Sequence, residues 1–157
     1  MNGLSKNILR IAAIAVLLFS PEAEATYRNR AALMGGLIKL NSPVKSAGVV
    51  GLEVEHRWYR WVGFGASGNY VLSKNPQVAY AAAPEFFFHP FEGDWFFNAG
   101  PLFQMRSGGY SKIGVRTGSR AMLFSINLLR IGAFFDYDFI NGGHQTSYGA
   151  TVEIHTF

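Results

Sequence analysis

The sequence predicts an all-β protein, namely a single eight-stranded antiparallel up-and-down β-barrel that crosses a membrane and follows an N-terminal signal peptide. Three observations predict it. The chain has 157 residues, enough for one domain but not comfortably for two. Its composition is 49% apolar, 15% aromatic and 15% charged, against a usual charged share of ~25%. Beyond residue 25 the apolar residues alternate with small or polar ones, and no apolar stretch is long enough for a transmembrane helix.

Residues 1–25 have the three-part layout of a secretory signal peptide. Lys6 and Arg10 supply positive charge, residues 11–19 form an apolar run, and Ala23-Glu24-Ala25 is a small-x-small cleavage site. As a helix this run would rise only ~13 Å, less than half of a ~30 Å hydrocarbon core, which argues against an N-terminal membrane anchor. We therefore expect cleavage after Ala25 and a mature barrel of residues 26–157.

Eight segments carry the period-two pattern, separated by short connections rich in turn residues. In chain order they are residues 28–40, 48–58, 62–72, 78–88, 95–105, 112–123, 129–139 and 147–157. The expected outer loops are residues 41–47, 73–77, 106–111 and 140–146.

From the second segment onward, one phase of each segment is apolar and the other is small or charged. In segment order, the apolar phase holds Val50, Leu52 and Val54; Val62, Phe64, Ala66, Tyr70 and Leu72; Tyr80, Ala82, Pro84, Phe86 and Phe88; Trp95, Phe97, Ala99, Pro101 and Phe103; Val115, Thr117, Ala121 and Leu123; Leu129, Ile131, Ala133, Phe135, Tyr137 and Phe139; and Tyr148, Ala150, Val152 and Ile154. The other phase is dominated by Gly, Ala, Ser, Asn and charged residues.

The apolar face could form the core of a soluble periplasmic ligand-binding barrel, or it could face lipid. Small residues on the polar face favour lipid on the outside, because an eight-stranded barrel has an interior only just wide enough for side chains to fill. If both termini are periplasmic, the aromatic residues form two membrane girdles. Tyr70, Tyr80, Tyr137 and Tyr148 fall near the outer rim, and Trp58, Trp61, Phe88 and Trp95 fall near the periplasmic rim.

With these features the chain resembles the small eight-stranded outer-membrane β-barrels, the OmpA/OmpX-type family in the broad sense, over residues 26–157. The resemblance rests on the signal peptide, the regular succession of eight strand-like segments, Ala83-Pro84-Glu85-Phe86, Asn98-Ala99-Gly100-Pro101 and the terminal Phe157. It implies an integral location in the bacterial outer membrane, contact with outer-membrane lipid including lipopolysaccharide, and recognition of Phe157 by the barrel assembly machinery. In that assembly signal, alternate residues counted back from the terminal Phe are usually apolar. Here they are polar, so the strand end is either bulged or Phe157 lies off the strand.

Ten charged residues fall on the lumen-facing phase and form the predicted lumen charge network. They are Glu53, Glu55, Arg57, Glu85, Arg116, Arg120, Arg130, Asp136, Asp138 and Glu153. Because an unpaired charge in a low dielectric is very costly, we expect a salt-bridge network that plugs the barrel and fixes the strand register. The alternative, a polar path for ions or a small solute, has little room in eight strands.

The sequence therefore favours a structural or surface-interaction protein without an open pore, cofactor or metal. Cysteine is absent, which excludes a zinc-thiolate site, a cysteine nucleophile and a lipoprotein anchor. The net charge of +4 comes without a block of like charges, so no nucleic-acid partner is expected. Basic residues near the outer end suit either loop solubility or the phosphates of lipopolysaccharide. They are Lys39, Lys45, Lys74, Arg106 and Lys112.

The enzymatic alternative is a lipid-modifying hydrolase resembling a lipid A deacylase. Its catalytic candidates are His144, Ser147 and Asp138, expected at the last outer loop and the strand before it. The deacylase pattern places His-x-Ser-Asn on a strand. His144-Gln145-Thr146-Ser147 departs from that spacing and lacks the Asn.

Overall fold

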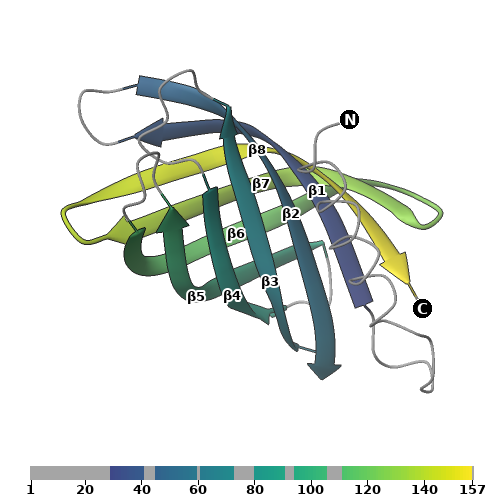
Figure 1. The fold of residues 1–157 in the computed structure, drawn as a ribbon. Helices are drawn as coiled ribbons and strands as arrows, with labels where there is room; N and C mark the ends of the chain where they lie inside the picture. The colour runs from purple at the N-terminus through teal and green to yellow at the C-terminus, as the bar shows by residue number, and fades with distance from the viewer. Residues whose placement is uncertain are drawn as a thin grey trace, which may run out of the picture.

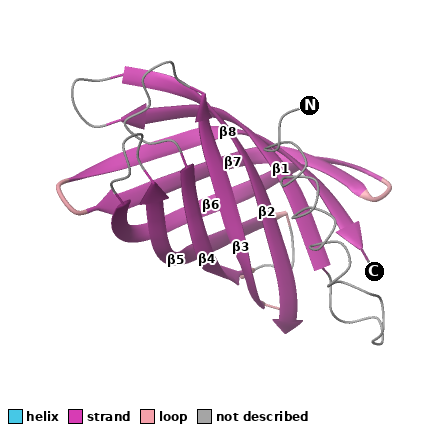
Figure 2. Ribbon diagram, viewed as in Figure 1, coloured by secondary structure: helices cyan, strands magenta, loops and turns pink. Residues whose placement is uncertain are grey.

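In the computed structural model, residues 29–40, 45–59, 61–72, 80–90, 94–105 and 111–156 are described, and these ranges contain eight strands. The strands are β1 (Asn29–Leu40), β2 (Lys45–Tyr59), β3 (Val62–Leu72), β4 (Tyr80–Phe88), β5 (Trp95–Met105), β6 (Ser111–Ile126), β7 (Leu129–Ile140) and β8 (Gly143–Thr156). Each strand pairs antiparallel with the next, and β1 also pairs with β8, so the sheet closes into a barrel (Figures 1 and 2). The predicted fold class is confirmed. None of the described ranges forms a helix that could span a membrane.

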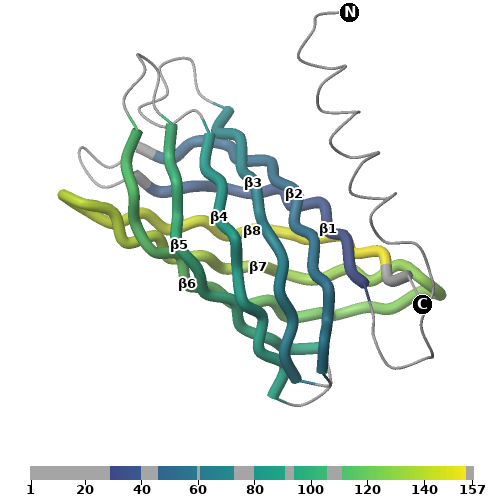
Figure 3. The backbone as a smooth tube through the Cα atoms, turned by 60° about the horizontal axis from the view of Figure 1, so that its bottom comes forward, coloured from purple at the N-terminus to yellow at the C-terminus, as the bar shows by residue number. Residues whose placement is uncertain are grey.

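Both ends of the described barrel lie together, because Asn29 of β1 pairs directly with Thr156 of β8. We call this the terminal end; the β2–β3, β4–β5 and β6–β7 connections also lie there (Figure 3). The opposite end, which carries the other four connections, is the loop end. The predicted signal peptide of residues 1–25 and the terminal Phe157 lie outside the described residues.

Two tight turns extend the last three strands beyond their predicted bounds. Asn141 and Gly142 form the whole β7–β8 turn, where Gly142 has φ +89, a left-handed conformation that glycine adopts without steric cost. Pairing therefore begins at Gly143, and the prediction of a last outer loop over residues 140–146 is wrong. In the same way β6 continues to Ile126, before a turn at Asn127 and Leu128.

The predicted phase of the sixth segment is observed up to its last residue, Leu123, which is 64% exposed. There β6 has a register shift between Met122 and Phe124. Neither pairing of β8 shows a register shift up to Thr156, and Thr151 and Glu153 both point inward. The described part of β8 therefore has no bulge that would change the phase of the chain end.

The alternation places large apolar side chains on the outside of the barrel. Phe86, Phe97 and Phe135 are 60%, 38% and 46% exposed, and many Leu, Val and Ile residues share this face. A soluble barrel would bury these residues, because exposing them to water is unfavourable. The outer face has instead the apolar character of a lipid-facing surface.

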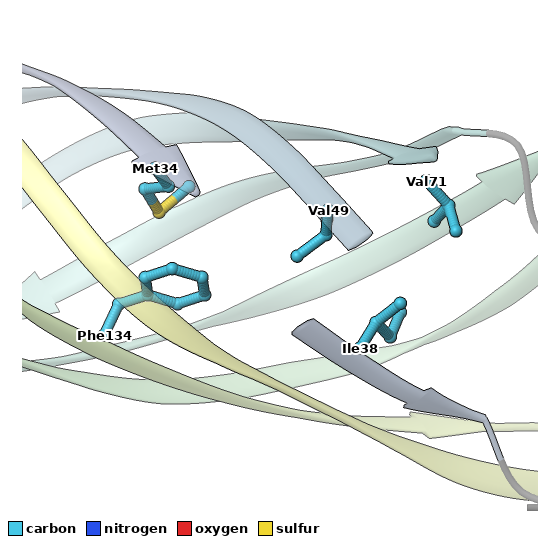
Figure 4. Packing of buried hydrophobic residues seen from close by; sticks show 5 residues of the cluster. All are labelled: Met34, Ile38, Val49, Val71 and Phe134. Atoms are coloured by element: carbon cyan, nitrogen blue, oxygen red, sulfur yellow. The ribbon is translucent and has the colours of Figure 1, made fainter. Parts of the chain in front are cut away.

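The interior is mixed rather than uniformly polar, because several inward positions carry apolar side chains. One cluster consists of Met34, Ile38, Val49, Val71 and Phe134, which point toward one another inside the barrel (Figure 4). A second cluster holds Ala81, Ala83, Leu102 and Ile140. Ile38, Val71 and Ile140 lie close to the loop-end termini of their strands, so apolar side chains share the half of the interior nearer the loop end with buried polar pairs such as Gln104 and Gln145.

Candidate functional site

Arg30 of β1 is the centre of the buried ion pairs. Its guanidinium donates from Nε to Glu55 at 2.9 Å, from Nη1 to Glu153 at 2.6 Å, and from Nη2 to Glu53. All four side chains are almost fully buried. One cation thus joins carboxylates from β2 and β8 to β1. Such charge-assisted hydrogen bonds are the strong ones in proteins.

Two aromatic rings surround the same guanidinium. The Arg30 Cζ lies 4.3 Å from the centroid of Phe96 and 5.1 Å from that of Phe87, within cation–π range. Arg30 is absent from the ten residues predicted for the lumen charge network. Its signal in the sequence was the alternation Arg30, Ala32, Met34, which places Arg30 on the inward phase of β1.

The network continues through Glu53 toward the other side of the barrel. The second carboxylate oxygen of Glu53 accepts from Arg120 Nη2 at 2.5 Å, and Arg120 Nη1 donates to Asp136 at 2.7 Å. Arg30, Glu53, Arg120 and Asp136 therefore alternate in charge from β1 through β2 and β6 to β7. Glu53 and Arg120 each lie between two opposite charges, which offsets their desolvation cost, whereas Asp136 at the end of the row is paired through Oδ1 with Arg120.

Arg116 forms a second centre nearer the loop end along β6. Its Nε and Nη2 donate to the two oxygens of Asp138 at 2.7 and 2.9 Å, a bidentate pair, and its Nη1 donates to the hydroxyl of Ser67 at 3.0 Å. Ser67 in turn donates to Glu85 at 2.7 Å, and Asn98 donates to the other Glu85 oxygen at 3.0 Å. Glu85 is thus held by neutral donors rather than by an arginine.

A histidine closes the interior at the terminal end. His89, directly after β4, is fully buried, and its Nε2 lies 2.6 Å from Glu55 Oε1. Arg57 Nη2 lies 2.9 Å from His89 Nδ1. Since a guanidinium can only donate, Nδ1 accepts and the ring proton lies on Nε2, where it is donated to Glu55. His89 is absent from the predicted site residues.

The ten predicted charges do not all lie in one place. Eight are almost fully buried: Glu53, Glu55, Glu85, Arg116, Arg120, Asp136, Asp138 and Glu153. Arg57 is partly buried at the terminal end. Arg130 lies at that end too, where it pairs with Asp94, whose side chain is 72% exposed.

The structure separates the three catalytic candidates. His144 is exposed on the outside of β8, where its ring stacks on Tyr137 at 5.5 Å between centroids. Ser147 is buried on the opposite face of the same strand, and its hydroxyl has no hydrogen-bond partner among the described residues. Asp138 is bound to Arg116 inside the barrel. A nucleophile, base and orienting acid need mutual hydrogen bonds, which this placement does not provide.

The predicted girdle residues are found toward opposite ends of the outer face. Trp58, Trp61, Phe88 and Trp95 are about half exposed and lie close to the terminal end. Tyr70 and Tyr80 face each other across β3 and β4 near the loop end, with ring centroids 5.1 Å apart. Tyr137 and Tyr148 lie nearer the loop end on β7 and β8. Within the described ranges, no group of three His, Asp or Glu side chains could hold a metal ion.

A closed eight-stranded barrel with an apolar outside and buried ion pairs inside is a small β-barrel of the outer-membrane type. Among solved structures, the chain is similar to the crystal structure of Neisserial surface protein A (NspA), with a TM-score of 0.51 and 12% identity. The match covers 85% of this chain and 99% of that one. The resemblance to small outer-membrane barrels is thus confirmed for the fold. No protein-family model and no curated protein sequence matches the chain.

Proposed function

We propose that this chain is an integral protein of the bacterial outer membrane that has a structural or surface-interaction role and no open pore. The observation that carries the proposal is the sidedness of the strands. Exposed Leu, Val, Ile and Phe side chains cover the outside, while eight of the ten charges of the network are buried inside. Lipid is the solvent that suits this arrangement, because a closed barrel satisfies every ladder hydrogen bond within the sheet.

The filled interior supports a barrel without conduction. Ion pairs centred on Arg30 lie toward the terminal end, and the apolar cluster around Met34 and Phe134 lies with the Arg116–Asp138 pair toward the loop end. An ion crossing the barrel would have to displace both. Eight-stranded barrels of this kind have lumens filled by side chains.

Two measurements on the mature protein test the proposal. Cold and boiled samples on an SDS gel should migrate differently, since a closed barrel resists SDS until it is heated. The folded protein in a planar bilayer should show no steady conductance. Protein that stays in buffer without detergent and shows no gel shift would instead favour a soluble ligand-binding barrel. Steady single-channel steps would overturn the closed interior.

A surface role at the loop end is part of the proposal. Lys39 Nζ lies 5.7 Å from the ring centroid of Tyr148, and Lys112 Nζ donates to the carbonyl oxygen of Asn141 at 2.9 Å. With both termini periplasmic, these ammonium groups lie at the outer side, where lipopolysaccharide carries phosphates. We expect the double variant Lys39→Ala, Lys112→Ala to bind purified lipopolysaccharide more weakly than the chain with Arg130→Ala at the terminal end. Equal binding by the two variants would argue that the lysines serve solubility alone.

Recognition of Phe157 by the barrel assembly machinery is the remaining part of the proposal. Deletion of this residue should lower the amount of heat-modifiable protein in the outer membrane. The same deletion should leave refolding of the purified chain into detergent micelles unchanged. A similar loss in micelles would indicate a role in stability instead.

A further inference from the structure

The β6–β7 hairpin extends past its neighbour β5 at the terminal end (Figure 1, green). The last residue of β6 that pairs with β5 is Ala121, opposite Trp95. From there β6 continues through residues 122–126, roughly 15 Å of additional strand. Met122 N still donates to the carbonyl oxygen of Asp94 at 2.6 Å, and beyond Met122 the described backbone partner of β6 is β7.

The outer face of this extension is apolar. Phe124 pairs with Ile131 and Ile126 pairs with Leu129, and Leu128 follows in the turn. All five are exposed, Phe124 and Ile126 by 67% and 65%. We call these five residues the apolar tip. The inward phase of the same stretch is polar, since it holds Ser125 opposite Arg130.

The bulge after Met122 makes the apolar tip possible. In an uninterrupted strand, Phe124 would share the inward phase of Met122, because side chains alternate with a period of two. The extra residue in β6 shifts the phase, so Phe124 comes opposite outward-facing Ile131. The lipid-facing surface of β7, with Ile131, Ala133 and Phe135, therefore continues without a break to the end of the hairpin.

The β2–β3 hairpin at the same end has a different composition. Its exposed residues are Trp58, Tyr59 and Trp61, which are 52%, 71% and 59% exposed. Trp and Tyr favour the headgroup level of a bilayer, whereas Leu, Ile and Phe favour the hydrocarbon. β2 and β3 lie across the barrel from β6 and β7. At the terminal end, the side chains of these two walls of the barrel therefore favour different depths in a bilayer.

We propose that the apolar tip is a lipid anchor, inserted among the acyl chains of the leaflet at the terminal end while the β2–β3 hairpin lies at headgroup level. The inference rests on the membrane location proposed above. Its partner is phospholipid, because the tip continues a surface that already faces lipid and has no charged residue on its outer face. The barrel axis is consequently inclined, with the β6–β7 wall deeper in that leaflet than the β2–β3 wall.

Site-directed spin labelling tests this directly, because the chain has no cysteine of its own. A nitroxide is attached to Leu128→Cys, to Val115→Cys on the outer face of mid-β6, and to Tyr59→Cys at the β2–β3 hairpin. Each protein is folded into phosphatidylcholine vesicles and its fold is checked by the gel shift. Relaxation by oxygen, which concentrates in hydrocarbon, is then compared with relaxation by a water-soluble nickel chelate.

We expect the oxygen-to-nickel accessibility ratio at Leu128→Cys to be close to that at Val115→Cys and several-fold above that at Tyr59→Cys. A ratio at or below that of Tyr59→Cys would overturn the anchor. Dipolar broadening between labels at Leu128→Cys would overturn it as well, because it would indicate a second copy on the tip. If Leu128→Cys fails the gel-shift check, Leu129→Cys is measured in its place.

The failure of the membrane location has a different signature from the failure of the anchor. A water-exposed label at Val115→Cys would contradict the location of the whole barrel in lipid. A lipid-exposed label at Val115→Cys together with a water-exposed label at Leu128→Cys would contradict the anchor alone.

Discussion

Arg30 and Glu153, which are 123 positions apart in the sequence, form a buried ion pair of 2.6 Å that joins the first strand of the barrel to the last. Backbone pairing of β1 with β8 closes the sheet, and this pair reinforces the closure from inside. The same guanidinium also binds Glu53 and Glu55 on β2. One side chain thus spans three consecutive strands across the seam of the barrel.

Replacing Arg30, which binds three buried carboxylates, should be strongly destabilising. Arg30→Met keeps much of the volume but leaves three buried carboxylates without their shared cation, and we expect a loss of ~3–5 kcal/mol in the free energy of unfolding. The measurement is the urea midpoint of the folded protein in micelles. Arg130→Met, which removes an arginine paired with exposed Asp94, is the matched control and should cost less than ~1 kcal/mol. Equal losses of unfolding free energy in the two variants would contradict the central role of Arg30.

The same substitution at two interior glutamates should have unequal effects. The described interior holds four arginines, at positions 30, 57, 116 and 120, against six carboxylates, at 53, 55, 85, 136, 138 and 153. Glu53→Gln removes the anion shared by Arg30 and Arg120 and should cost ~3–5 kcal/mol. Glu85→Gln removes a charge held by Ser67 and Asn98, and should change stability by less than ~1 kcal/mol. The urea midpoints of the two variants measure these effects. A larger loss of stability in Glu85→Gln than in Glu53→Gln would disprove the assignment of Glu53 as the shared anion.

Closure of the barrel should depend on a glycine pair. Gly36 of β1 lies opposite Gly149 of β8, and a Cβ on Gly36 would come within 2.1 Å of the Tyr148 carbonyl oxygen. We expect Gly36→Ala to destabilise the fold by ~1–3 kcal/mol, since backbone on both sides would have to move. The neighbouring Gly35 points outward with open space around its Cβ position, so Gly35→Ala is the control and should be neutral. Both are compared by the temperature at which the gel shift is lost.

Stability should fall at mildly acid pH because of one histidine. Burial lowers the pKa of His89, against the opposing hydrogen bond to Glu55. The unfolded chain therefore binds a proton at a higher pH than the folded one, and the contribution of His89 is present above pH ~6.5 and lost as the pH falls.

The variant His89→Gln isolates this effect, because an amide can donate to Glu55 and accept from Arg57 without titrating. The difference in urea midpoint between wild type and His89→Gln should change between pH 7.5 and pH 5 in favour of the variant. A constant difference over this range would show that His89 does not contribute to the pH dependence.

The interior charges show where sequence reasoning reaches its limit. Alternation is a local property, so it indicated the inward phase of Glu53, Glu85 and Arg116 without any knowledge of their partners. Pairing is not local. Glu85 was expected to be a paired charge, but Ser67 and Asn98 hold it, because β3 and β5 rather than a strand with an arginine flank β4.

Arg30 and His89 were missed for a related reason. Arg30 lies at the start of the first segment, where the alternation of Arg30, Ala32 and Met34 indicates an inward phase but no partner for the charge. His89 lies one residue beyond the end of β4, where a sequence reading expects solvent. Both side chains are buried because residues from other strands cover them, Phe87 and Phe96 for Arg30 and Glu55 with Arg57 for His89.

The sequence by itself determined the eight strands, their inward and outward phases and the all-β class, because a period of two in apolar residues follows from backbone geometry alone. Only the tertiary structure decided which charges meet and where the apolar clusters of the interior lie. These relationships depend on the stagger between strands and on closure of β1 against β8. Closure brings together residues more than a hundred positions apart in the sequence, and a local pattern of residues does not indicate such contacts.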